Sequence, residues 1–500
     1  MDKLLDLVKL VNGYLTDYIL IFLLVGVGIY FTIRTRFVQV RCFGEGMKKV
    51  FGNIKLFGGK NKGGMSSFQA LATAIAAQVG TGNIVCASGA LLLGGPGAIF
   101  WMWVIAFFGM ATIYAEAVLA QQTRVKGENG EIFGGPVYYI KKAFKGGFGK
   151  FLAVFFSIAA ILALGFMGSM VQSNSIAESV TNAVTAATGF TASWIPWVVG
   201  AIVALLAAVI FVGGVNRIAA VTEKLVPVMA CLFLLGGVVI LAINIKDLPA
   251  TFGMIFKYAF TPQAIIAGGI GAALKAAVSQ GAKRGLFSNE AGMGSTPHAH
   301  ALANVKNPHD QGVVAMIGVF IDTFVVLTMT ALVVISSMYC GDGILADKLT
   351  SVDNVYGIAV NGEFNEAGEK IADAIVSKTT IMQESFTETL PEFFGSFGSI
   401  FVAICLFFFA FSTIVSWNLF GKLNVQSLFK NKKWAVISYA VISVAFIFLG
   451  SILKNDLVWE LTDFFNYLMV LPNAIALFAL GKFVADEAKR AKEAKKASKK

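Results

Sequence analysis

The sequence predicts an all-α integral membrane protein with eleven transmembrane helices, and three observations support this fold class. The 500-residue chain is 57% hydrophobic and only 14% charged, whereas soluble proteins carry charged side chains at about a quarter of their positions. Apolar runs of roughly twenty residues, long enough to cross a bilayer as a helix, recur along nearly the whole chain. The alternating ten-residue pattern of a transmembrane barrel is not visible in the sequence.

Each expected span is one of these apolar runs. The first run has no basic flank before it and no small-residue cleavage site after it, which predicts a retained helix and not a signal peptide. The eleven spans are expected near residues 14–33, 66–92, 97–122, 150–178, 195–212, 221–244, 262–283, 312–338, 395–421, 434–452 and 459–482.

Every second loop between the expected spans is rich in basic residues, and this pattern predicts how the chain is oriented in the plasma membrane. The loop 34–62 carries eight basic residues and one acid, so we expect it in the cytoplasm and the N-terminus outside. The same rule places the C-terminus in the cytoplasm. The other cytoplasmic loops would carry Arg124, Lys126, Lys141, Lys142, Arg217, Lys283, Arg284, Lys422, Lys432 and Lys433. Membrane orientation thus accounts for the net charge of +11, and we expect no nucleic-acid partner.

The long loop 340–394 is expected outside, because it has ten acids against three lysines. Its segment 362–386 is expected to include a short amphipathic helix that covers the outer side. A partner-binding element is the alternative.

The segment AAQVGTGNIV, residues 76–85, places helix-weakening residues near the middle of the second span. Gly80 and Gly82 predict a break there, with opened backbone groups that protein or ligand must satisfy. Carbonyls around Ala76 to Val79 could hold a cation, and the N–H groups of Thr81 to Ile84 could hold an anion. Close packing against a neighbouring span is the alternative explanation of the two glycines.

A second glycine-rich stretch lies in the seventh span, AIIAGGIGAALKAAV, with Gly268, Gly269 and Gly271. Two breaks in oppositely directed spans are typical of an inverted-repeat secondary transporter with its site between them. The expected units are an N-terminal helix and basic loop (1–65), two five-helix halves (66–244 and 262–482) and a basic tail (483–500). GTGNIV does not fit a dinucleotide fingerprint, and no phosphate-binding motif for ATP is present.

The stretch GGPGAIFWMWVIAFFG, residues 94–109, resembles the signature of the alanine or glycine:cation symporter family. ALATAIAAQVGTGNIVCASGA, FGGPVYYI and GLFSNEAGMGSTPHAHA resemble the same family, over residues 66 to about 480. This resemblance implies a leucine-transporter-like fold of ten core helices with one extra N-terminal helix. It also implies sodium-coupled uptake of alanine or glycine.

The implied substrate is a zwitterion, which needs donors for its carboxylate and acceptors for its ammonium. Thr81, Gly82 and Asn83 are the expected donors, and carbonyls around Gly268 to Gly271 are the expected acceptors. The similarity of fold implies a sodium site made by carbonyls of Ala76 and Val79 and by hydroxyls of Ser412 and Thr413. Paired hydroxyls in a span can instead bond back to their own helix.

Several uncharged side chains complete the predicted substrate site. Gln78 and Gln172 are costly in lipid and should face the bundle interior; Gln172 could line the site or bond across helices. Phe166 and Trp417 could close the pocket over a small side chain, with plain packing as the alternative. The substrate-binding set is therefore Gln78, Gly80, Thr81, Gly82, Asn83, Phe166, Gln172, Gly269, Gly271 and Trp417.

Proton coupling through Glu116, Asp322 or Lys275 is the alternative mechanism, although pairing or snorkelling also explains these residues. A channel or a membrane receptor is the alternative class, but no pore rings or filter loops are visible. We expect no enzyme activity and no cofactor beyond the coupling sodium ion. The histidines of STPHAHALANVKNPH are expected in a solvated loop. The sequence does not distinguish a preference for alanine from one for glycine, or a preference for L-amino acids from one for D-amino acids.

Overall fold

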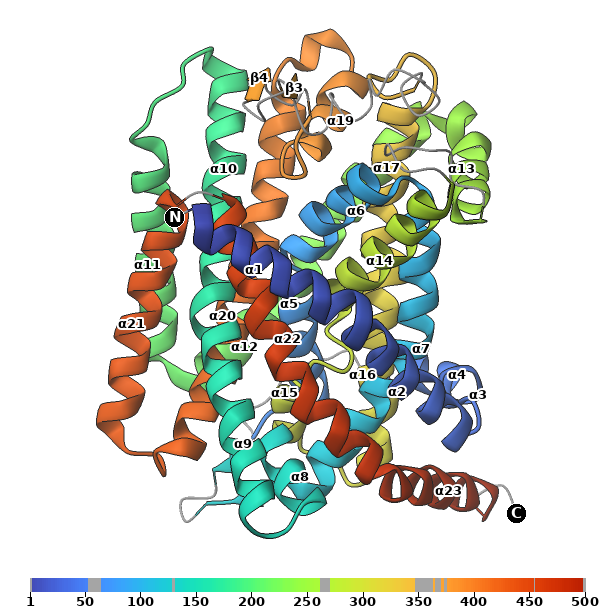
Figure 1. The fold of residues 1–500 in the computed structure, drawn as a ribbon, viewed down its shortest axis with the longest axis vertical. Coiled ribbons are helices and arrows are strands. Elements are labelled where there is room, and N and C mark those ends of the chain that lie inside the picture. Colours follow the sequence, from blue (N-terminus) through green and yellow to red (C-terminus); the bar gives the residue numbers. More distant parts are fainter. Residues whose placement is uncertain are drawn as a thin grey trace.

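The computed structural model describes residues 2–52, 64–127, 131–260, 270–346, 363–364, 370–372, 376–453 and 455–497. Helices make up nearly all of this part (Figure 1). Two short antiparallel strand pairs join them. Val125–Lys126 (β1) pairs with Ile132–Phe133 (β2), and Glu363–Phe364 (β3) pairs with Lys370–Ala372 (β4).

The helices of the first half of the chain lie between Asp2 and Phe260. They are α1 (Asp2–Tyr14), η1 (Leu15–Leu20), α2 (Ile21–Arg34), α3 (Val38–Arg41), α4 (Phe43–Phe51), α5 (Ser67–Gln78), η2 (Gly82–Cys86), α6 (Ala87–Gly94), α7 (Gly97–Thr123), α8 (Pro136–Ala143), α9 (Gly146–Ala160), η3 (Ile161–Gly168), α10 (Ser169–Thr188), α11 (Ile195–Val212), α12 (Gly214–Ile243), η4 (Ile245–Asp247) and α13 (Leu248–Phe260).

The second half includes the most buried long helix. Its helices are α14 (Ile270–Asn289), α15 (Pro297–Leu302), α16 (Pro308–Val319), η5 (Phe320–Leu327), α17 (Thr328–Val334), η6 (Ile335–Tyr339), α19 (Ile381–Thr389), η8 (Glu392–Phe394), α20 (Phe397–Leu428), α21 (Lys433–Ile452), α22 (Asn455–Ala479) and α23 (Gly481–Ala497).

Eight helices in the described residues are long and apolar enough to cross a membrane, and the bent pair α5 and η2–α6 makes up to nine. They match nine of the eleven expected spans. For the first expected span, the apolar helix Ile21–Arg34 is shorter than a full crossing. The seventh expected span begins in residues outside the described part. The chain is therefore a multi-pass helical membrane protein, and eleven remains a prediction.

Local sequence explains where several helices begin. Ser66 caps α5 through a reciprocal capping box with Gln69, which satisfies two otherwise orphaned backbone donors. Pro136, Pro297 and Pro308 occupy the first turns of α8, α15 and α16, where the missing proline N–H costs nothing.

Burial separates central helices from peripheral ones. In the most apolar window of α20, 72% of residues are buried inside the protein, against 33% for α11 and α21. Exposed apolar side chains such as Leu205, Val209 and Ile437 lie on those outer helices, as expected for a surface that faces lipid. The site must therefore be sought around α20.

Lys283 and Arg284 do not lie in a cytoplasmic loop, so that part of the loop-charge prediction is wrong. Both are inside α14 and pair with the buried carboxylate of Asp463 on α22, at 3.3 and 3.5 Å. A basic residue within a bundle is stabilised by such a partner instead of marking the cytoplasmic side.

The predicted solvated histidine loop is also wrong. His298, His300 and His309 are buried in α15 and α16. The His298 ring stacks on Phe156 and Phe420. Both ring nitrogens of His298 have hydrogen-bond partners, Ser295 and Asn424, and Nδ1 of His300 is bonded to Gln311, so the histidines belong to the core.

The loop expected outside lies partly beyond the described residues. Its described part contains the β3–β4 pair and α19, so the expected short helix lies at the end of the segment 362–386. Gln383 of α19 donates to the carbonyls of Ser179 and Ser399. The helix is therefore attached to α10 and α20 as a cover.

Candidate functional site

The break predicted in the second span is confirmed. α5 ends at Gln78, Val79 leaves the helical region with φ −80° and ψ 83°, and the helix resumes at Gly82 with a bend of 46°. The rotation at Val79 turns its carbonyl away from the helix axis. In Figure 1, α6 lies above α5, so the break is well inside the bundle.

Gly80 and Gly82 are also sites of close packing. A Cβ on Gly80 would collide with the Thr413 hydroxyl, and a Cβ on Gly82 would lie 2.9 Å from Cα of Ser288. The two glycines therefore serve both purposes: they allow the helix to break, and they allow close packing against neighbouring segments. Both glycines bring the opened segment against the elements that bear the predicted sodium ligands and the end of α14.

Three of the four predicted sodium ligands come together. Thr413 Oγ1 and Ser412 Oγ lie 2.9 and 3.3 Å from the Ala76 carbonyl. Both hydroxyls also reach the Phe409 carbonyl of their own helix, at 3.1 and 2.9 Å, which is the expected back-bonding. Val79 lies at the end of the same half-helix. The arrangement concentrates neutral, hard oxygen atoms in a dry interior.

The polar residues of the predicted substrate site have mixed roles. Gln172 Oε1 accepts from the Thr81 N–H at 3.3 Å, so α10 faces the opened backbone. Gln78 donates to the Asn289 carbonyl at 2.8 Å. Asn83 is already engaged, because its amide donates to Asp322 and its oxygen accepts from Gly80 N–H. The Asn83 side chain therefore braces the break, its backbone N–H donates to the Gly80 carbonyl at 3.3 Å, and its donor role toward a substrate stays a prediction.

Some buried polar atoms at the break have no hydrogen-bond partner among the described residues. They include the Thr81 hydroxyl, the side-chain amide oxygen Oε1 of Gln78 and the Ser416 hydroxyl. Buried polar atoms are nearly always satisfied in native proteins. These atoms can therefore contact a bound polar ligand.

The described interruption of the seventh span does not lie at the predicted glycines. Gly271 is helical in the first turn of α14, while Gly268 and Gly269 lie outside the described residues. α14 continues to Asn289, and the non-helical segment 290–296 separates it from α15. Gly292 and Gly294 within it have φ of +90° and +81°, a conformation that favours glycine. The acceptor role of carbonyls around Gly268–Gly271 stays a prediction, and the segment 290–296 offers a second set of backbone carbonyls.

Buried carboxylates hold the two interruptions in place. Glu116 of α7 accepts from the N–H groups of Gly292 and Gly294, both at 3.0 Å, and from Asn473 at 2.7 Å. Asp322 accepts from Asn83 at 2.8 Å and from Ser288 at 3.0 Å. Asp322 thus joins the second span directly to the end of α14. Of the other proton-coupling candidates, Lys275 belongs to α14, but its side chain lies outside the described part.

Trp417 and Phe166 point to different neighbours. The Trp417 indole N–H donates to Glu290 at 2.6 Å, and its ring lies against Gly168. The Phe166 ring packs instead on Tyr439 and Phe446 of α21. Phe166 and Gly168 are two positions apart in η3 and therefore point to roughly opposite sides of the helix. Because Trp417 lies against Gly168, Phe166 is not placed to close a pocket with Trp417.

A sequence model of the sodium:alanine symporter family matches residues 1–500. The chain belongs to this family. It is an amino-acid symporter, and its relatives are transporters and not enzymes.

Two curated relatives cover nearly the whole symporter. The sodium/alanine symporter AgcS of Methanococcus maripaludis is 37% identical over 494 residues, which are 98% of each chain. The Bacillus subtilis protein named "Probable sodium/glutamine symporter GlnT" is 35% identical over 501 residues, covering 100% of this chain and 93% of that one. The two relatives are named for different substrates and are about equally similar to this symporter. Its own substrate must therefore be inferred from its own binding site.

A solved structure supports the fold of the symporter. MhsT in complex with L-phenylalanine superposes with a TM-score of 0.58 over 84% of this chain and 90% of that chain. The two sequences are 16% identical, so the likeness concerns the fold alone.

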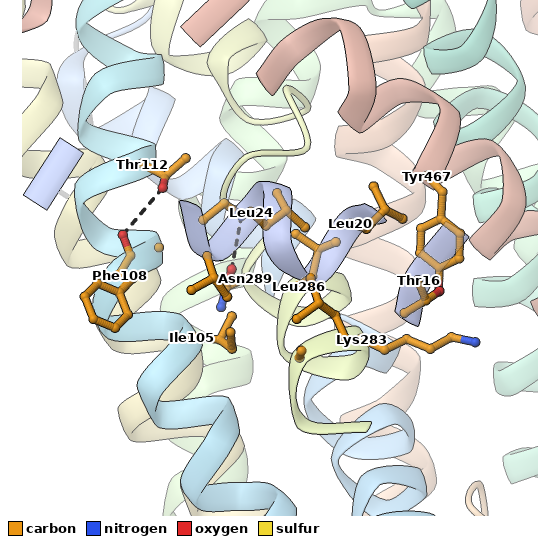
Figure 2. A pocket seen from close by; sticks show the side chains of 15 residues that line it. Thr16, Leu20, Leu24, Ile105, Phe108, Thr112, Lys283, Leu286, Asn289 and Tyr467 are labelled. Carbon is orange, nitrogen blue, oxygen red and sulfur yellow. Dashed lines mark hydrogen bonds between the residues drawn. The ribbon is translucent and has the colours of Figure 1, made fainter. Parts of the chain in front are cut away.

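A cavity outside the predicted site lies between the N-terminal helices η1 and α2 and the helices α7 and α14. Its volume is about 20 Å³, which is enough for about one water molecule. Figure 2 shows Leu20 of η1 and Leu24 of α2 beside Leu286 and Asn289 of α14. Its lining is largely apolar, and it shares none of the predicted site residues of the symporter.

The sequence interpretation missed the residues at the end of α14. Ser288, Asn289 and Glu290 contact Asp322, Gln78 and Trp417 respectively. The available signal was SNEAGMGSTP, in which polar residues and two glycines precede a proline. Such a cluster is a stronger break signal than glycines within an apolar run.

Proposed function

We propose that this symporter imports small neutral amino acids, alanine or glycine, together with sodium by alternating access across the plasma membrane. The observation that carries the proposal is the approach of Ser412 and Thr413 to the Ala76 carbonyl at the break after α5. Neutral hard oxygens suit an alkali cation and exclude soft metals.

The proposed sodium ligands are the carbonyls of Ala76 and Val79 and the hydroxyls of Ser412 and Thr413. The cation would replace the hydrogen bonds that the two hydroxyls now donate to the Ala76 carbonyl, while both hydroxyls keep their bonds to the Phe409 carbonyl. It would also neutralise the negative end of the α5 dipole. Sodium binding would thereby stabilise the opened backbone on which the amino acid depends.

The proposed amino-acid site lies beside this cation. Backbone N–H groups at Thr81 and Gly82 would bind the substrate carboxylate, which would take the place of Gln172 Oε1 as the acceptor of the Thr81 N–H. Carbonyls of the segment 290–296 accept from the ammonium. Trp417 limits the side chain to a small size, because its ring already lies against Gly168.

The proposed topology keeps the sequence-based arrangement. Eleven spans form one N-terminal helix and two inverted five-helix halves, 66–244 and 262–482, with the N-terminus outside and the C-terminus in the cytoplasm. The loop-charge pattern supports this orientation. The two interrupted spans, one in each half, support the inverted repeat.

Proton coupling is the second candidate. Glu116, Glu290 and Asp322 are buried around the two interruptions, and no ion pair is made by them within the described ranges. An intramembrane carboxylate is a reasonable proton carrier. Their hydrogen bonds to neutral donors favour a bracing role, so sodium is the first candidate.

Uptake into proteoliposomes tests the proposal. Labelled alanine should accumulate with an inward sodium gradient and not with potassium or with a proton gradient alone. Equal accumulation under a proton gradient without sodium would select the second candidate. Glutamine competition as strong as that of alanine would reject the small-pocket assignment.

Trimming Trp417 to alanine tests the size limit. The enlarged pocket should admit leucine, with its competition against alanine rising about ten-fold or more. The measurement is the leucine concentration that halves alanine uptake. Strong leucine competition in the wild type would show that Trp417 does not limit the pocket.

A further inference from the structure

Glu290 occupies an unusual position next to the proposed amino-acid site. It directly follows α14, has a φ of +57° and is fully buried. A non-glycine residue in this left-handed region is strained, and such strain persists only where surrounding contacts impose it. The left-handed residue ends α14, with its N–H bonded to the Leu286 carbonyl at 2.9 Å, and the Glu290 carboxyl makes further hydrogen bonds there.

The carboxylate of Glu290 holds two donors at once. The Trp417 indole N–H donates to Oε1 at 2.6 Å, and the Ser295 hydroxyl donates to Oε2. Glu290 thus joins both ends of the segment 290–296 to α20. Both oxygens of the buried Glu290 carboxyl are thereby satisfied, and an unsatisfied polar atom in a low-dielectric interior would be costly.

The Trp417 ring is confined on its other sides. A Cβ on Gly168 would collide with Cζ3 and Cε3 of the indole. Phe287 lies edge-on, with ring centroids 6.0 Å apart. Gly168 and Phe287 thus limit the ring on two sides, and the bond to Glu290 opposes its movement away from Gly168.

Helix periodicity places this ring one turn from the proposed ligands. Trp417 follows Thr413 by four residues on α20, and Gln172 follows Gly168 by four residues across the junction of η3 and α10. Residues four apart lie on the same helix face. Trp417 therefore lies one turn from Thr413, which is next to Gly80 together with Gln172.

We infer that Glu290 is a positioning residue that holds the Trp417 indole against Gly168 and thereby sets the upper size of the transported side chain. This inference rests on the proposed function, since it assigns a role within the same amino-acid site. Glu290 acts through Trp417 and need not contact the substrate.

The test uses the full-length protein and measures, for each variant, the ratio of leucine to alanine concentrations that displace bound labelled alanine. Glu290→Leu removes both acceptor oxygens at similar volume and should lower this ratio at least about ten-fold. Glu290→Gln keeps a carbonyl acceptor for the indole and should retain a ratio close to that of the wild type. Glu388→Leu, at an exposed position on α19, is the matched control and should leave the ratio unchanged.

A double-mutant cycle separates positioning from direct contact. Trp417→Phe keeps a ring but has no N–H, so adding Glu290→Leu to it should cause no further change in the ratio. If Glu290 instead contacts the substrate ammonium, Glu290→Leu weakens alanine binding equally in both backgrounds and Glu290→Gln does not rescue it. That result, or an unchanged ratio in Glu290→Leu, overturns the inference.

A second variant covers the case in which Glu290→Leu does not fold. Ser295→Ala removes the other donor and should lower the ratio in the same direction, by a smaller factor. An unchanged ratio in folded Ser295→Ala would then overturn the inference. Failure of the wild type to bind alanine would reject the proposed function itself, because that result does not depend on Glu290.

Discussion

At the scale of single residues, the hydroxyls of Ser412 and Thr413 determine whether the site can hold a cation. Both reach the Ala76 carbonyl across the interface between α20 and α5. Their additional bonds to Phe409 show that local back-bonding and a ligand role are compatible. The geometry needs only a small hydroxyl rotation to present oxygen lone pairs to an ion.

Replacing Ser412 and Thr413 with alanine removes two of the four proposed oxygen ligands. We expect the sodium concentration for half-maximal alanine uptake to rise at least about ten-fold, which corresponds to roughly 1.4 kcal/mol. Sodium titration of uptake in proteoliposomes measures it. Ser399→Ala, elsewhere on α20, is the control, and an unchanged sodium dependence in the double variant contradicts the site.

A second prediction concerns Glu116, whose two oxygens accept the N–H groups of Gly292 and Gly294. Glu116→Gln places an amide donor against a backbone donor, which should cost about 1–3 kcal/mol of stability. We expect a lower melting temperature with sodium-driven uptake retained in the surviving protein. A stable variant that has lost the pH dependence of uptake would favour proton coupling.

At the scale of helices, two interruptions face each other. Gly82 of η2 packs on the backbone of Ser288, and Asp322 bonds to both Asn83 and Ser288. The opened segments are thus joined through buried polar groups and not only through apolar packing. Movement of one interrupted span must therefore be transmitted to the other.

Gly82→Ala tests this joint. The added methyl would lie 2.9 Å from Cα of Ser288, and backbone cannot move aside as a flexible side chain can, so overpacking of about 1–3 kcal/mol is expected. Gly89→Ala on α6 is the control, because its Cβ would meet Lys378 at an ordinary 3.7 Å. The melting temperature and the affinity for alanine should both fall for Gly82→Ala and stay unchanged for Gly89→Ala. Equal melting temperatures and equal alanine affinities of the two variants would contradict the proposal that Gly82 and Ser288 join the two interruptions.

At the scale of the whole molecule, the C-terminal helix is fastened to the N-terminal part of the chain. α23 runs across the lower end of the bundle in Figure 1. Its Lys495 pairs with Glu45 of α4 at 2.8 Å, and the same carboxylate lies 3.4 Å from His309 of α16. Lys49 adds a further ion pair, to Asp310 at 2.8 Å. Charged side chains thus join three segments that are distant in sequence.

The docking of α23 should depend on pH. Burial by itself raises the pKa of Glu45, but Lys495, His309 and Lys49 outweigh it and lower the pKa below its ordinary value of 4.5. A lowered carboxyl pKa stabilises the docked state above pH 4.5, and this stabilisation is lost as the pH falls through the lowered pKa. Limited proteolysis should therefore cut α23 faster in acid.

The variant Glu45→Gln should reproduce that faster cleavage at neutral pH. Glu493→Gln is the control, because the ion pair that Glu493 makes among the described residues is with the exposed Lys489 of its own helix at 3.9 Å, a contact of little energetic value. If Glu45→Gln and the wild type are cleaved at the same rate, the ion pair does not hold α23 in place.

The sequence by itself determined the class of the protein, most of its spans and the first break. Length and polarity of apolar runs decide membrane insertion locally, and Gly80 and Gly82 weaken a helix wherever it packs. The approach of Ser412 and Thr413 to Ala76 agrees with the arrangement that the family resemblance implied.

Only the tertiary structure decided the position of the second interruption, the pairing of Lys283 and Arg284 with Asp463, and the burial of the histidines. Each depends on a partner distant in the chain. Glu116 supplies the acceptors that let 290–296 leave the helix, and Asp463 neutralises charges that would otherwise mark a loop. A buried polar group is stabilised by whatever lies opposite it, and local sequence does not specify that neighbour.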